Sequence, residues 1–157
     1  MSSIARTNQL LYQVELLLAL AEDARTASPD EHAVARRMAL EEAALGQLEL
    51  ALNALLREVT GHMDLSHAGW RGWLSDSTAG VAELERLRGL AARPDSWLAV
   101  LIARLEDLNG DDGAARRDAR SGLIASAGAA PLSETLRWCH RELKSLLPAL
   151  REGSREW

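Results

Sequence analysis

Leucines recur three and four residues apart along most of the chain, and this spacing constrains the fold more than any other feature. Residues 10–21, 97–108 and 136–150 each carry it. In the longest run, seven apolar residues fall within an arc of about 100° when each residue turns the helix by about 100°: Val34, Met38, Leu45, Leu48, Leu52, Leu55 and Val59. Such an arc predicts an amphipathic helix with one buried face.

The residue types point the same way. The chain has no phenylalanine and one tyrosine, Tyr12, so it is poor in the aromatic residues that favour strands. Its 157 residues match the size of one domain. We therefore expect an all-α fold in a single domain over residues 1–157, an up-down four-helix-type bundle of antiparallel helical hairpins.

The helices are expected over about residues 3–25, 29–60, 77–109 and 132–155, with loops at 61–76 and 110–131. The third helix should break at residues 93–94, because Pro94 has no N–H to donate and disfavours helix at the residue before it. Trp70 and Trp73, in the first loop, are expected to pack against the bundle.

The second helix carries signals at both ends. Ser28 is a natural N-cap, and Pro29 suits the first helical position. Gly61 is the expected C-terminal stop. The short break between the first two helices predicts an antiparallel hairpin.

Glu41 falls near the middle of the apolar arc of the second helix. A buried carboxylate is costly unless it is paired, and the candidate partners are Tyr12, His140 and Arg137. We favour a structural pair with an arginine, the tyrosine hydroxyl or His140, which would fix the register of the helices. One alternative is an internal polar pocket that binds or turns over a small molecule. Another is a gap between helices that leaves Glu41 in water.

Some apolar residues lie on the side that should face solvent. Leu40 and Leu50 point away from the main arc of the second helix, and Trp138 lies about 130° from the apolar centre of the last helix. A helix that is apolar on two sides is central in its bundle or contacts another chain, and tryptophan often anchors interfaces. Either the segment 111–131 or the loop 61–76 covers these positions, or they form a homodimer face or a docking surface.

Known catalytic patterns are not matched. Di-iron bundles need Glu-x-x-His, which the chain lacks, and a zinc site at Cys139 would lack its second cysteine. The Arg-x₄₋₆-His spacing of HEPN-type ribonucleases occurs at Arg57 and His62, but chance produces such spacings in a chain rich in arginine. We expect no metal and no cofactor, disfavour an enzyme, and keep a HEPN-like ribonuclease as a remote alternative.

Charge and hydropathy restrict the partners. The net charge is −5 with both signs interspersed, unlike the basic stripe of nucleic-acid-binding proteins. LLYQVELLLALA resembles a secretion signal, but Gln13 and Glu15 interrupt it, and it is shorter than a membrane span. The lone Cys139 suits a reducing compartment. We expect a cytoplasmic protein with no nucleic-acid or membrane partner.

Three stretches, ARTNQLLYQVELLL, PDSWLAVLIA and TLRWCHRELKSLLPALREGSREW, carry the landmark residues Asn8, Tyr12, Trp97 and Trp138. Together they resemble an uncharacterised family of small helical proteins from gammaproteobacteria, a domain of unknown function that spans nearly the whole chain. The resemblance implies a bacterial, intracellular single domain and supplies no activity. The function expected is therefore a non-enzymatic helical bundle acting through protein contacts, as a homodimer or a small adaptor.

Overall fold

The structure is a computed structural model that describes residues 1–27, 30–61, 69–75, 80–117 and 130–153. These residues form six helices and no strand: α1 (Ser3–Thr26), α2 (Ala33–Thr60), α3 (Trp70–Ser75), α4 (Ala82–Ala92), α5 (Trp97–Leu108) and α6 (Leu132–Gly153). The prediction of an all-α helical bundle is confirmed.

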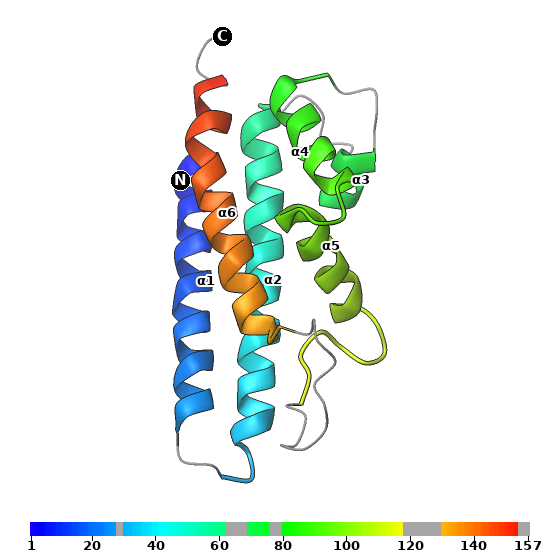
Figure 1. Ribbon diagram of the computed structural model, residues 1–157. Helices are drawn as coiled ribbons and strands as arrows, with labels where there is room; N and C mark the ends of the chain where they lie inside the picture. Colours follow the sequence, from blue (N-terminus) through cyan, green and yellow to red (C-terminus); the bar gives the residue numbers. More distant parts are fainter. Residues whose placement is uncertain (28–29, 62–68, 76–79, 118–129, 154–157) are drawn as a thin grey trace.

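Helices α1 and α2 form a long antiparallel hairpin, and α6 lies along both (Figure 1). The shorter helices α3, α4 and α5 pack on the other side of α2. Helix α2 is thus the central element, in contact with each of the other helices. This position explains much of its second apolar side, because Ala51 and Ala54 are buried together with the main leucine arc.

The core is built from the predicted leucine faces. Leu45, Leu48 and Leu52 are fully buried, and burial of each leucine side chain contributes about 1.5–3 kcal/mol. Trp70 and Trp73 on α3 are also buried, so the prediction that they pack against the bundle is confirmed.

Polar contacts fix the position of α3 against α2. The backbone N–H of Trp70 donates to the Asn53 side chain at 2.9 Å, and its indole N–H donates to Glu49 at 2.8 Å. Because both acceptors belong to α2, they hold the first residue of this short helix in place.

The predicted break at Pro94 is confirmed, since α4 ends at Ala92 and α5 begins at Trp97. Ser96 caps α5, where its hydroxyl accepts the backbone N–H of Ala99 at 3.1 Å. Helix α6 runs through Pro148 as one helix.

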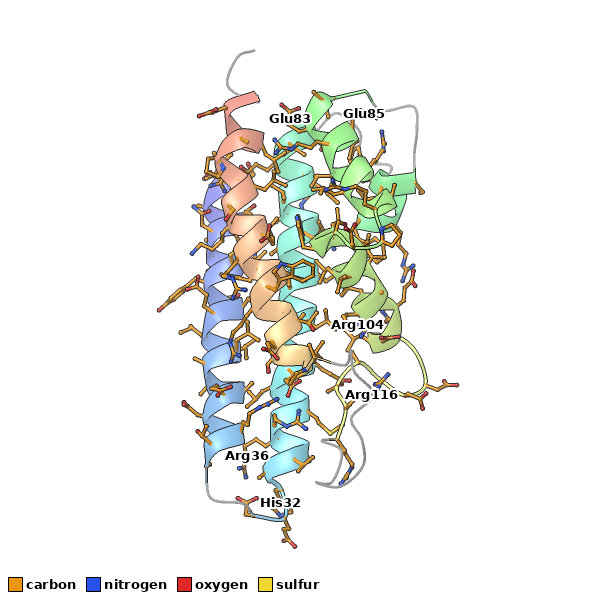
Figure 2. The ribbon with its side chains drawn as sticks, in the orientation of Figure 1. His32, Arg36, Glu83, Glu85, Arg104 and Arg116 are labelled. Carbon is orange, nitrogen blue, oxygen red and sulfur yellow. The ribbon has the colours of Figure 1, made fainter. Side chains whose placement is uncertain are left out.

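The predicted starts of two helices were too early. Helix α2 begins at Ala33 rather than at residue 29, because the Asp30 carboxylate accepts the His32 backbone N–H at 2.7 Å and forms a turn there. His32 marks this end of the bundle in Figure 2. The predicted cap, Ser28, lies outside the described residues.

Helix α4 begins at Ala82 rather than at residue 77, after extended backbone at Val81. The predicted stop of α2 at Gly61 is confirmed, with a left-handed φ of 57°.

Candidate functional site

The buried carboxylate of Glu41 is paired along its own helix. Glu41 is fully buried, as predicted, and Arg37, one turn earlier on α2, is buried beside it. The Arg37 guanidinium donates from Nη1 to Glu41 Oε1 and from Nη2 to the backbone carbonyl of Arg116 at 2.9 Å. The i, i+4 spacing of Arg37 and Glu41 is the sequence signal that could have identified this pair.

Glu42, which follows Glu41 on α2, binds the segment after α5. Glu42 Oε1 accepts the backbone N–H groups of Ala114 and Ala115 at 2.8 and 3.2 Å. Arg37 also contacts Arg116, and Arg116 is labelled in Figure 2. Together these hydrogen bonds attach residues 114–116 to α2. The role of this arrangement is structural: Arg37 pairs with buried Glu41 and also donates a hydrogen bond to a backbone carbonyl of the loop after α5.

The predicted polar cluster around Glu41 does not form. Tyr12 points outward from α1 and is 58% exposed, because Leu11, Val14 and Leu18 occupy the inner face of that helix. Arg137 instead contacts Glu22 at 3.3 Å. The internal pocket proposed around Glu41 therefore loses the groups that would have lined it.

His140 serves as a link between α6 and α1. It is buried, and its Nε2 lies 3.0 Å from the Leu11 carbonyl oxygen and 3.4 Å from Glu15. Since a carbonyl accepts only, Nε2 carries the proton in this contact. Burial lowers the pKa of His140, against the opposite effects of the Leu11 carbonyl and Glu15.

Cys139 is enclosed beside His140. Its thiol donates to the Trp97 carbonyl at 3.5 Å, and burial raises the pKa of Cys139 to about 12. A thiol that stays protonated at neutral pH is a poor nucleophile and a poor metal ligand. Cys139 is therefore a core residue.

Helix α1 is apolar on its outer side as well as its inner side. Tyr12, Leu16 and Leu20 follow one another at intervals of four residues and are 58%, 47% and 51% exposed. We call these three residues the outer face of α1. Leu50 on α2 is 45% exposed, and a hydrogen bond of 2.7 Å from Gln47 to Gln13 joins the two helices.

Polar contacts border the outer face on the side of α6. Lys144 donates to Glu15 at 2.9 Å, and Arg151 donates to Asn8 at 3.0 Å. The outer face is therefore an exposed apolar strip with polar margins, the usual form of a protein interaction surface.

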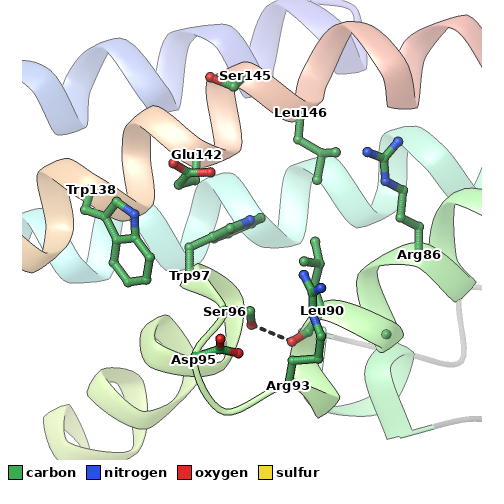
Figure 3. Close-up of a pocket in the computed structure, with 11 residues that line it drawn as sticks. Arg86, Leu90, Arg93, Asp95, Ser96, Trp97, Trp138, Glu142, Ser145 and Leu146 are labelled. Atoms are coloured by element: carbon green, nitrogen blue, oxygen red, sulfur yellow. Dashed lines mark hydrogen bonds between the residues drawn. The ribbon is translucent and has the colours of Figure 1, made fainter.

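The three predicted interface residues differ in exposure. Leu50 is exposed as expected, whereas Leu40 is half-buried. Trp138 is also half-buried and packs against the core, so it is partly covered. It forms one wall of a groove between α6 and the turn from α4 to α5 (Figure 3). The sequence pattern did not identify Leu16 and Leu20.

The described part of the chain offers neither a metal cluster nor a membrane-spanning helix. No cluster of three or more His, Cys, Asp or Glu side chains there could hold a metal ion. None of the described helices has the length and apolar character needed to cross a membrane.

Comparison with known protein families yields a match over the whole chain. A family model described as "Family of unknown function (DUF6586)" covers residues 1–157, which agrees with the resemblance seen in the sequence. No curated protein and no solved structure matches the chain.

Proposed function

The chain belongs to the family of unknown function DUF6586, and from its surface we propose that it is a non-enzymatic interaction module that works as a homodimer. The observation that carries this proposal is the outer face of α1. Tyr12, Leu16 and Leu20 lie on the side of the helix opposite the core and are about half exposed. A helix that is apolar on both sides, with one side already buried, has a surface suited to a second chain.

The charges around the outer face favour a second copy of the same chain. The Arg6 guanidinium donates to Gln9 at 2.7 Å, so its positive charge lies beside Gln9. Asp23, near the other end of α1, makes no ion pair with the described residues. One end of the face is thus positive and the other negative.

An antiparallel pair of α1 helices brings these ends together. With Leu16 opposite Leu16 of the second copy, Tyr12 lies opposite Leu20, since each is four residues from the centre. Gln9 and Asp23 are both seven residues from the centre, so each Asp23 meets the Arg6 guanidinium of the other copy. A parallel pair would bring Arg6 against Arg6. The self-complementary arrangement is that of a two-fold dimer.

The test is the replacement Leu16→Glu, followed by sedimentation velocity over a range of concentrations. It places two carboxylates at the centre of the dimer, so we expect the dimer Kd to rise by about 100-fold or more. Ile4→Glu is the matched control: Ile4 is 38% exposed and lies about 120° around α1 from Leu16. The control should leave the Kd unchanged. Equal effects of the two replacements would contradict the proposal.

A further inference from the structure

The groove beside Trp138 is a second candidate site, separate from the outer face of α1. It lies between α6 and the turn from α4 to α5 (Figure 3) and encloses about 810 Å³. Binding sites for small molecules measure about 300–1,000 Å³. Because the outer face of α1 belongs to the other side of the bundle (Figure 1), a ligand in the groove would not compete with a second copy of the chain.

Part of the groove lining is apolar and aromatic, between polar and charged side chains. Trp97, the first residue of α5, is 5% exposed and presents its ring to the groove beside Leu146 and Leu90. Trp138 stands at one end, on α6. Trp97 is too well covered to offer a whole ring face, so the aromatic surface of the groove comes mainly from the half-buried Trp138, against which a flat ring can pack at low cost in conformational entropy.

The opposite end of the groove is cationic. Arg86 on α4 and Arg93 just after it reach the end away from Trp138 (Figure 3). Within the described residues, neither side chain makes a hydrogen bond or an ion pair. By contrast Arg88, on the same helix, donates to Glu85 at 3.0 Å and to the Trp73 carbonyl at 2.9 Å. Among the described residues, Arg88 has partners, whereas the donors of Arg86 and Arg93 have none.

An acidic group lies at the Trp138 end. Glu142 lines the groove there, on the other side of Trp97 from the two arginines, whereas Asp95 lies in the turn two residues after Arg93 (Figure 3). A negative group at that end would be repelled, whereas at the arginine end it would meet guanidinium donors whose geometry suits a carboxylate or a phosphate. The separation of charges therefore gives a ligand one preferred orientation.

We propose that this groove binds a small planar aromatic anion. Its ring packs against Trp138 and the exposed edge of Trp97, and its carboxylate or phosphate group lies at the arginine end between Arg86 and Arg93. Glu142 excludes the inverted orientation.

The test uses 2-naphthoate as the probe and isothermal titration calorimetry on the full chain. The positively charged 2-naphthylmethylammonium is the matched ligand, and we expect it to bind at least tenfold more weakly. The double variant Arg86→Gln, Arg93→Gln should weaken 2-naphthoate binding by about 10–100-fold, as expected when charge-assisted hydrogen bonds are lost. Arg141→Gln removes an exposed arginine of α6 outside the groove and should leave binding unchanged.

Two further variants complete the test. Trp138→Ala should weaken binding by about 5–10-fold, as expected for loss of an aromatic contact. Leu16→Glu should leave binding unchanged, which separates this site from apolar binding to the outer face of α1 and from the proposed dimer. Absence of binding at millimolar 2-naphthoate, equal binding of the two ligands, or full binding by the double arginine variant would each overturn the proposal.

Discussion

The region around Glu41 and the outer face of α1 both break the rule that apolar groups lie inside and charges outside. Glu41 is a fully buried acid, but Arg37 neutralises it and also bonds to the backbone at Arg116. Leu16 and Leu20 are exposed apolar groups that no described residue covers. The charge of the first exception is paired within the chain, although Glu41 Oε2 has no hydrogen-bond partner among the described residues. The second exception is not covered.

This difference separates structural from functional features. A buried charge that the fold satisfies explains how helices and loops stay in register. An exposed apolar strip with polar margins has a cost in water that only another molecule can remove. The unsatisfied region is therefore the better guide to function, although Glu41 is the more conspicuous residue in the sequence.

The largest predicted effect is on the Glu41 side of this comparison. Arg37→Met leaves Glu41 buried without its cation and should lower the free energy of unfolding by about 3–5 kcal/mol, measured by urea denaturation. Arg36→Met is the control, because Arg36 is exposed and its carboxylate partner, Asp30, is 3.6 Å away. It should cost less than about 1 kcal/mol. A loss equally small in Arg37→Met would contradict the structural role of the pair.

The next prediction sharpens the account of the outer face. Arg6→Asp and Asp23→Arg should each weaken the dimer by about 3–10-fold, because each places like charges opposite one another at both ends. The double variant restores opposite charges and should recover most of the wild-type Kd in sedimentation experiments. Additive weakening in the double variant would show that Arg6 and Asp23 do not meet across the interface.

A smaller effect is expected from His140, which like Glu41 is a buried polar group with a partner inside the chain. Burial lowers its pKa in the folded state, so as the pH falls the unfolded chain takes up the proton first. The contribution of neutral His140 to the free energy of unfolding is complete above about pH 6.5, the usual pKa of histidine. This contribution is lost as the pH falls through the pKa that His140 has in the folded protein. The Tm should fall between pH 7.5 and 5.5.

The control for this pH effect is His140→Gln. The glutamine amide can still donate to the Leu11 carbonyl but does not titrate. The Tm of this variant should change less with pH over the same range. An equal fall in both proteins would assign the pH dependence to other groups.

The helices could be predicted because their signals are local. Leucine spacing, Gly61 and Pro94 act within one or two turns, and the structure places α2, α4 and α5 accordingly. The start of α2 was wrong because the turn at Asp30 competes with a helix start at Pro29.

The same helical geometry predicted that Glu41 is buried, but it did not identify Arg37 as the partner of Glu41. The partners expected from the sequence lie on other helices, whereas Arg37 lies one turn away on the same face of α2. Tyr12 was misplaced because α1 is apolar around most of its circumference, so its spacing does not determine which side faces the core. The groove at Trp138 depends on how α4 and α5 pack against α6, which no local pattern encodes.

The most direct test of the central proposal is the mass of the wild-type protein by sedimentation equilibrium. The account predicts a mass that approaches twice the 17.1 kDa of one chain as the concentration rises. A mass that stays at 17.1 kDa up to about 1 mM, the Kd range of very weak complexes, would contradict the assignment of the outer face of α1 as a homodimer interface.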